Sequence, residues 1–316
     1  MKKLATVDIT LFTEDLNDQI GEIHVNRHLS REDKQRALIE LGLKKEDLRV
    51  IYNGLYYNPK TPIRVVTPKG KTFTFGTEIE CFVRPDLIHE SARALGVQIA
   101  YEDYNHVDGK THYKFVSDSS VRSLNSEEDR NSIECVSPIL KGAKGLSSLK
   151  KACQALNNAG ATVNKSCGLH VHIGVSELAG NAIVNIFKNY AMLEPIIDAF
   201  MAPSRRNNGF AKSLHNLNFS GCENIFDLQD RMRGDRYYKV NAMAYNRHKT
   251  VEFRQHQGTT NFTKISMWVN FCVKLVEWSE KNLFSSIPTT VDEIPFLNAK
   301  EKAFFKARTN EMTNDR

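Results

Sequence analysis

Three short segments of this chain each place two chemically active side chains two residues apart, around a single apolar residue. The pairs are Glu78 and Glu80, His170 and His172, and Glu252 and Arg254. Residues two apart on a β-strand point to the same face of a sheet. The pattern therefore predicts a sheet with one apolar face and one face that gathers carboxylates, imidazoles and a guanidinium.

Carboxylates gathered on one wall need compensating positive charge, because burying uncompensated charge is costly. Divalent metal ions supply that charge, and oxygen ligands favour Mg²⁺, while a histidine nitrogen also suits Mn²⁺. An arginine beside the metals can hold phosphate oxygens, so the combination is typical of phosphoryl transfer. Taken alone, each pair also fits an exposed polar strand or a surface ion pair. It is the joint pattern that indicates a site.

The remaining periodicity predicts an α+β chain, with strands and helices interleaved irregularly. Strands are expected at residues 72–83, 132–136, 167–175, 237–245 and 250–256. Helices are expected at residues 145–159, 177–201 (bent near Pro195) and 263–281. A core domain over residues 71–285 follows from this arrangement.

The two ends of the chain differ from this core. Residues 1–70 form an N-terminal appendage with strands at 7–12 and 49–57 around a helix at 31–45, whose start carries a capping signal, Ser30 followed by Asp33. Residues 286–316 are a polar C-terminal tail with room for one more helix.

The composition fits a soluble globular protein, with 41% hydrophobic and 25% charged residues. No apolar run is long enough to cross a bilayer, and the N-terminus lacks a secretory signal. The six cysteines include no C-x-x-C pair, which argues against disulfides and structural zinc. We therefore expect a cytoplasmic protein, without a prediction of oligomeric state.

Basic residues are concentrated between residues 204 and 254, a stretch that contains ten Lys or Arg but only five acidic residues. Such a surplus suits an anionic ligand, such as phosphates, a carboxylate or nucleic acid. It is also compatible with a solvated basic surface.

Six segments, in this order, resemble the "putative amidoligase" family. They are FGTEIE at 75–80, DSSV at 118–121, IECVSPIL at 133–140, SCGLHVHIG at 166–174, PSRR at 203–206 and TVEFRQHQGT at 250–259. GLHVH also looks like the Gly-Met-His-x-His run of glutamine synthetases. The resemblance covers about residues 72–280 and implies a glutamine synthetase-like curved antiparallel sheet, a funnel with flanking helices.

The resemblance also implies roles for individual residues. The metal ligands implied are Glu78, Glu80, Glu134, His170 and Glu252. Arg254, Arg247 and either Arg205 or Arg206 would contact phosphate or carboxylate, and His172 would lie near the nucleotide. Asp118 would bind metal or hold the amine, although an Asp-Ser-Ser run also suits a turn. His256 could extend the same wall or be structural.

The function implied is an ATP-dependent carboxylate–amine ligase that uses ATP and Mg²⁺ (or Mn²⁺). A small-molecule carboxylate, glutamate-like by analogy, would become an acyl phosphate, and a primary amine would then displace phosphate to form an amide. Three alternatives stay open. One is a metal-dependent hydrolase in which His170 and His172 bind zinc with Glu252 or His256. A second keeps the fold but is a phosphotransferase that moves the γ-phosphate to a guanidino or amino acceptor. The third is a basic nucleic-acid-binding module, which the acidic wall and the absence of an RNP-like aromatic pattern disfavour.

Overall fold

The computed structural model describes residues 23, 30–40, 73–102, 111–118, 120–122 and 130–314. The chain divides into two compact units, Met1–Val66 and Thr67–Arg316. In the first unit the described residues form helix α2 (Arg31–Glu40), and Ser30 Oγ accepts a hydrogen bond from the Asp33 backbone N–H at 3.1 Å. This confirms the predicted start of the helix; residues 41–45 and the two predicted strands lie outside the described residues.

The second unit is built on one mostly antiparallel sheet, which confirms the α+β class. The strand order is β2-β3-β4-β1-β6-β8-β7, with β5 paired to β1. Its one described parallel pairing joins β2 to β3. The strands are β1 (Thr74–Val83), β2 (Ile99–Tyr101), β3 (Tyr113–Ser117), β4 (Asn131–Val136), β5 (Leu140–Lys141), β6 (Gly168–Gly174), β7 (Val240–Asn241) and β8 (Thr250–Gln257).

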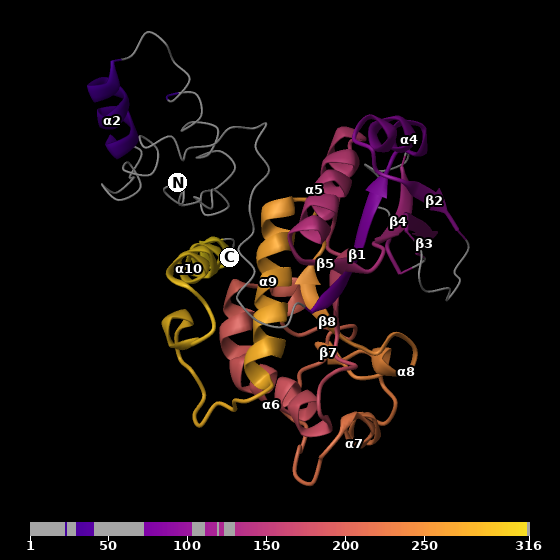
Figure 1. The fold of residues 1–316 in the computed structure, drawn as a ribbon, viewed down its shortest axis with the longest axis vertical. Coiled ribbons are helices and arrows are strands. Elements are labelled where there is room, and N and C mark those ends of the chain that lie inside the picture. Colours follow the sequence, from indigo (N-terminus) through magenta and orange to yellow (C-terminus); the bar gives the residue numbers. More distant parts are fainter. Residues whose placement is uncertain are drawn as a thin grey trace, which may run out of the picture. The chain divides into compact units, whose positions relative to one another are not determined.

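Helices α5, α6 and α9 lie together on one side of this sheet (Figure 1), where α9 packs on β6 and contacts α5 and α6. The helices are α4 (Pro85–Ala94), α5 (Gly142–Asn158), α6 (Gly180–Phe200), α7 (Ile225–Arg231), α8 (Ala244–His248), α9 (Phe262–Ser279) and α10 (Ala299–Asn314), with short 3₁₀ turns at Pro203–Arg205 and Val291–Glu293. The opposite face of the sheet is the polar one.

Apolar residues of the central strands form the layer between sheet and helices. Ile79, Val171 and Phe253, the residues inside the three polar pairs, are all fully buried. Because side chains alternate along a strand, their burial against the helices turns the flanking polar residues to the other face. The predicted division into an apolar and a polar face is confirmed.

Strand β8 departs from strict alternation. Leu169 of β6 pairs with His256, but Val171 pairs with Phe253, so one residue of β6 opposes two of β8. This β-bulge shifts the alternation and turns His256 to the helix side, where its ring centroid lies 5.7 Å from that of Trp268 on α9. The expectation that His256 could extend the polar wall is therefore wrong.

The predicted strand at 237–245 is also largely wrong. Only Val240–Asn241 is strand, and residues 244–248 form α8. The Asn241 side chain explains the change, because its Oδ1 accepts a hydrogen bond from the Met243 N–H at 2.7 Å and turns the chain. Lys249, in the left-handed conformation, then ends α8 before β8 begins.

A buried ion cluster joins β7 and β8 to helix α6. Lys239 is completely buried, and its Nζ lies 2.9 Å from Glu194 Oε1 and 2.6 Å from Asp198 Oδ1. Gln255 of β8 donates to the same Asp198, and its Oε1 accepts from the Tyr190 hydroxyl at 2.6 Å. The network fixes the strand segment that carries Arg254.

The C-terminal residues contain helix α10, which packs on α6. Phe305 of α10 is buried, with its ring centroid 4.6 Å from that of Phe200. Among the helices of the described ranges, none combines the length and apolarity required to span a membrane.

We expect His256 to make the fold sensitive to acid. Burial, with the nearby charges of Arg308, Arg205 and Lys264, lowers the pKa of His256 to about 3, from 6.5. The unfolded chain takes up this proton below pH 6.5 while the folded chain does not, so the free energy of unfolding should fall by about 1.4 kcal/mol per pH unit between those values.

Urea unfolding between pH 7 and pH 4 measures this slope. His256→Gln should reduce it, whereas His215→Gln, at an exposed histidine, should leave it unchanged. Equal slopes in wild type and His256→Gln would contradict the assignment.

Candidate metal centre

The strand register aligns polar residues across the open face of the sheet. Glu80 pairs with Glu134 across β1 and β4. Glu78 pairs with His170 across β1 and β6. His172 pairs with Glu252 across β6 and β8, and Glu252 with Asn241 across β8 and β7. Paired residues face the same side at close distance, so five strands bring their polar side chains into one continuous row.

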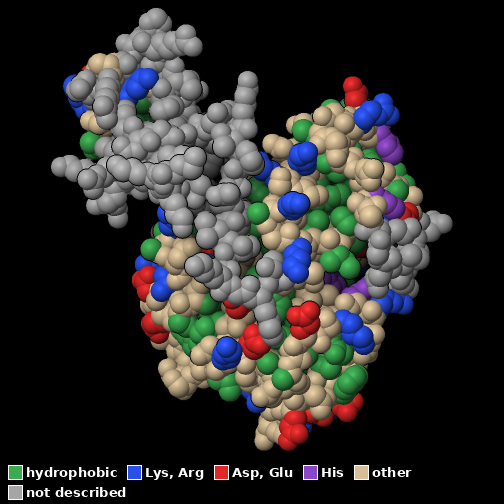
Figure 2. Space-filling view, in the orientation of Figure 1, with side chains coloured by type: hydrophobic (Ala, Val, Ile, Leu, Met, Phe, Trp, Pro, Cys, Tyr) green, Lys and Arg blue, Asp and Glu red, His purple; other side chains and the backbone are tan. Residues whose placement is uncertain are grey.

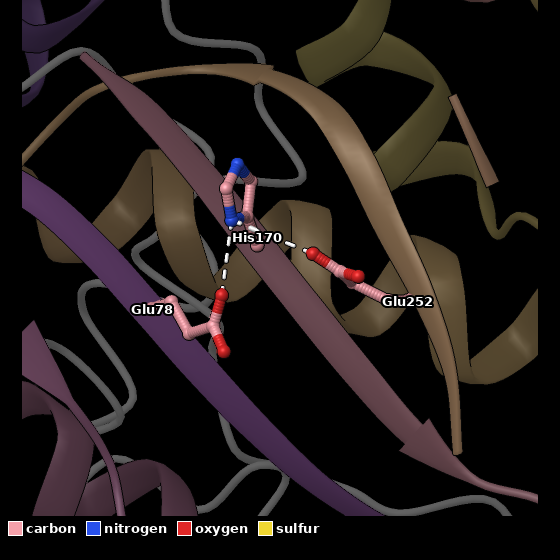
Figure 3. A group of neighbouring side chains, drawn as sticks. All are labelled: Glu78, His170 and Glu252. Atoms are coloured by element: carbon pink, nitrogen blue, oxygen red, sulfur yellow. Dashed lines mark hydrogen bonds and ion pairs between the residues drawn. The ribbon is translucent and has the colours of Figure 1, made fainter. Parts of the chain in front are cut away.

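The centre of this row is a group formed by Glu78, His170 and Glu252 (Figure 3), which we call the first group. His170 lies between the two carboxylates, with Nδ1 3.0 Å from Glu78 Oε2 and 3.5 Å from Glu252 Oε1. Each residue offers one ligand atom, and the three atoms lie within 4.8 Å of one another. That geometry can hold one metal ion.

A second group consists of Glu80, Glu134 and His170, also with ligand atoms within 4.8 Å. Here His170 presents its other nitrogen, Nε2, 3.5 Å from Glu80 Oε1. The Gly168 N–H donates to Glu80 Oε2 at 2.5 Å, which holds that carboxylate in place. A neutral imidazole has one lone pair, so His170 can serve as ligand to one group at a time.

Gly168 leaves space where the second group meets Arg205. A Cβ on this residue would lie 3.1 Å from both Arg205 Nη2 and His170 Nε2, and 3.3 Å from Glu80 Oε2. A larger residue would push against three side chains of the site.

His172 lies beside the first group. Its Nδ1 is 3.0 Å from the Thr250 hydroxyl, and its ring is 5.9 Å, edge to face, from the ring of His248 on α8. Its Nε2 is 3.2 Å from Glu78 Oε1, yet it is buried without a hydrogen bond of acceptable geometry. Arg254 Nε is a second buried nitrogen without a hydrogen bond. Both nitrogens lie near Glu252 and are able to bind a further polar group.

The carboxylates of the row are held in different states of charge. Burial opposes ionisation of Glu78, but His172 and His170 outweigh it and keep the pKa of Glu78 well below its usual range. Burial likewise opposes ionisation of Glu252, yet Arg254 and His172 lower its pKa. Burial and then the charges of Glu78 and Glu80 raise the pKa of Glu134 well above its usual value. The cations of the row thus stabilise the charges of Glu78 and Glu252 but do not stabilise a charge on Glu134.

The two arginines nearest the row have different surroundings. Arg254 contacts Glu252 through Nη1, and its guanidinium carbon lies 5.7 Å from the ring centre of Tyr237. Arg205 is buried inside the β8 bulge, where Nη2 donates to the Arg254 carbonyl at 2.5 Å and Nε to the Gln255 carbonyl at 3.3 Å. Arg205 therefore fixes the bulge while its charge faces Glu80.

Other residues expected at the site lie at its edge or away from it. Asp118, half-buried after β3, accepts from the Ser120 N–H at 2.7 Å, as expected for a turn, and its charge still acts on Glu134. Arg206 points away and donates to the carbonyls of Met201 and Met312. Arg247 is exposed on α8, and no described contact links it to the row.

Part of the basic surplus between residues 204 and 254 is engaged in ion pairs. Lys239 belongs to the buried cluster behind the sheet, and exposed Lys212 has its Nζ 2.5 Å from Asp235. Figure 2 shows Lys and Arg side chains dispersed among acidic and apolar ones over the coloured part of this face, without one continuous basic patch.

Asn241 is a site residue that the sequence analysis did not select. It is buried on β7, and its Nδ2 donates to Glu252 Oε2 at 2.6 Å. Thr250, His248 and Tyr237 were missed as well. The available signal at Asn241 was an amide inside the apolar run VNAMA at 240–244. The short pairing of β7 with β8, which places Asn241 beside Glu252, cannot be predicted from the sequence.

These features define an α+β protein with a cluster of carboxylates and histidines, of a kind that could hold a metal ion, on the open face of its sheet. The family described as "Putative amidoligase enzyme" matches residues 71–276, well over half of the 316-residue chain. The chain belongs to this family, as its motifs predicted, and is a ligase-type enzyme. No curated protein matches it. Family membership favours neither the hydrolase nor the nucleic-acid-binding alternative.

We expect Glu134→Gln to stabilise the metal-free protein. The raised pKa of Glu134 means that the folded state retains a proton that the unfolded chain loses above its ordinary pKa of 4.5. The free energy of unfolding therefore falls as the pH rises from 4.5 to the pKa of Glu134 in the folded state. Glutamine removes the charge and can still donate to Glu78. In EDTA at pH 8, where the folded wild type carries this unfavourable charge or proton, the free energy of unfolding of the variant should exceed that of wild type.

Urea unfolding at pH 5 and pH 8 measures this gain, with Glu177→Gln at an exposed position as the control. Saturating Mg²⁺ should narrow or reverse the difference, because a bound ion stabilises the wild type more. A Glu134→Gln protein that is less stable than wild type in EDTA would contradict the electrostatic account.

Proposed function

We propose that this chain is an ATP-dependent carboxylate–amine ligase that forms an amide through an acyl phosphate, releasing ADP and phosphate. The observation that carries the proposal is the pair of carboxylate groups around His170, with Arg254 beside them, in a member of the amidoligase family. The mechanism requires no nucleophilic serine or cysteine. All six cysteines are buried and free.

The donor set fits a hard divalent ion. Glu78, Glu80, Glu134 and Glu252 supply carboxylate oxygens, and His170 supplies one nitrogen. Mg²⁺ prefers oxygen ligands, and Mn²⁺ also accepts imidazole. When bound, such ions would offset negative charge on the phosphoryl oxygens of ATP. The excess of carboxylates over cations in the row supports this assignment.

The protein's own residues have distinct tasks in the proposed reaction. Arg254, with Nε free of a hydrogen bond, would bind a phosphoryl oxygen while its Nη1 remains on Glu252. His172, whose Nε2 lies 3.2 Å from Glu78 Oε1 without forming a hydrogen bond, would lie near the nucleotide phosphates. Arg205, engaged in the bulge, would position Arg254 instead of contacting the substrate.

The chemistry then takes two steps. An oxygen of the substrate carboxylate attacks the γ-phosphorus of ATP. The bond from that phosphorus to the oxygen it shares with the β-phosphate breaks, so an acyl phosphate forms and ADP leaves. The amine nitrogen next attacks the acyl carbon, the bond from that carbon to the phosphate oxygen breaks, and phosphate leaves. Asp118 would accept the proton that the amine releases, since its carboxylate lies at the end of β3 and its charge acts on Glu134 of the row.

The mostly antiparallel sheet with one polar and one helix-covered face supports a glutamine synthetase-like fold. By that analogy the carboxylate substrate is glutamate-like and the second substrate is a primary amine. Analogy of fold supports the class of reaction more strongly than it supports these particular substrates.

The proposal predicts that ATP turnover depends on a carboxylic acid and that hydroxylamine captures the activated acyl group. Purified protein incubated with ATP, Mg²⁺ or Mn²⁺, pooled carboxylic and amino acids, and hydroxylamine should give ADP and a hydroxamate. Glu80→Gln and Glu252→Gln should lower hydroxamate formation on the order of 100-fold, because each removes a charged ligand.

Glu177→Gln, the same change at an exposed position, is the matched control and should retain full activity. Formation of AMP and pyrophosphate would indicate an acyl adenylate in place of the acyl phosphate and would contradict the mechanism. Near-native activity in both site variants would contradict the assignment of the site.

A further inference from the structure

Asn241 joins the turn before α8 to the carboxylate of Glu252. Its side chain is buried, and both ends of its amide are hydrogen-bonded. One end contacts the Met243 backbone nitrogen at 2.7 Å, and the other contacts Glu252 Oε2 at 2.6 Å.

These two contacts determine the orientation of the amide. The Met243 N–H can only donate, so the atom of Asn241 that faces it must be the oxygen. The atom that faces Glu252 is therefore the NH₂ group, which donates. A donor at this position favours the ionised carboxylate and occupies one lone pair of Oε2.

The other oxygen of Glu252 faces the site. Oε1 contacts Arg254 Nη1 and lies 3.5 Å from His170 Nδ1 and 4.0 Å from His172 Nε2. The two carboxylate oxygens thus have separate roles, with Oε2 anchored to Asn241 and Oε1 presented to the first group. Rotation of the carboxylate to present both oxygens would break the bond to Asn241.

We propose that Asn241 is a positioning residue that restricts Glu252 to one metal-facing oxygen and thereby favours Mg²⁺ over Ca²⁺. The proposal rests on the cation site of the proposed function. Mg²⁺ requires compact octahedral coordination, in which a carboxylate usually supplies one oxygen, whereas the larger Ca²⁺ accepts a carboxylate through both oxygens. A Glu252 freed from Asn241 can turn both oxygens inward and loses this preference.

The test is calorimetric titration of the nucleotide-free protein with MgCl₂ and with CaCl₂. Asn241→Leu removes both hydrogen bonds. Asn241→Ser keeps an oxygen for the Met243 N–H but is too short to reach Glu252, so it preserves the turn. Both variants should bind Mg²⁺ about 10- to 100-fold more weakly than wild type, the usual cost of losing a residue that orients a metal ligand. Ca²⁺ affinity should fall less, so the ratio of Mg²⁺ affinity to Ca²⁺ affinity should fall.

Asn246→Ala is the local control, because Asn246 is exposed on α8 and its Oδ1 accepts from Gln229. It should leave both affinities unchanged. In a Glu252→Gln background the Asn241→Ser change should have no further effect on the Mg²⁺/Ca²⁺ ratio, because it acts through that carboxylate. A role confined to the turn would instead give the same effect in both backgrounds.

The proposal is overturned if Asn241→Ser binds Mg²⁺ within about twofold of wild type, well below the usual cost. It is equally overturned if the ratio shifts as much in the Glu252→Gln background. Either result, with wild-type Mg²⁺ binding and hydroxamate formation intact, leaves the proposed function standing. A wild-type protein that binds neither ion would overturn the cation site itself.

Discussion

The antiparallel register of β1, β6 and β8 is the constraint on which the rest of the site depends. It sets Glu78 opposite His170 and His172 opposite Glu252, so residues separated by more than 170 positions share one face. A slip of one residue in any of these strands would turn its polar pair toward the helices and its apolar residue toward solvent. The full burial of Ile79, Val171 and Phe253 prevents such a slip.

The same register creates an electrostatic cost that the protein offsets only in part. Histidines and Arg254 stabilise the charge on Glu78 and Glu252, while Glu134 is left among other carboxylates. Supporting contacts come from outside the row: the Gly168 N–H holds Glu80, Asn241 holds Glu252, and Arg205 holds the bulge. Under the proposed function, cations and phosphates would restore, on binding, the stability that this site gives up without ligands.

Much of this architecture follows from local sequence patterns. Alternation of apolar and polar residues predicted the strands around Glu78, His170 and Glu252, and the family resemblance identified Glu134 on a further strand. The structure brings these residues together. What local alternation cannot reveal is a change of register, and the bulge in β8 is the example: it turns His256 to the helices although it lies two residues beyond Arg254.

Residue type also proved a poor guide to the partner of an arginine or an amide. Arg205 and Arg206 are adjacent, yet one is buried in the bulge and the other binds carbonyls at the ends of α6 and α10. Asn241 was predicted in the middle of a long strand, but it ends β7, because its side chain turns the chain and its bond to Glu252 depends on a tertiary pairing of only two residues. These contacts arise from packing between distant segments, which no short window of sequence contains.

The most direct test of the account is a crystal structure of the protein with MnCl₂, with anomalous diffraction measured to locate the ion. The account predicts anomalous density on the open face of the sheet, with carboxylate oxygens of Glu78 and Glu252, or of Glu80 and Glu134, as ligands, and His170 beside it. An ion held by His170 and His172 without those carboxylates, or a sheet face without density at saturating Mn²⁺, would contradict it.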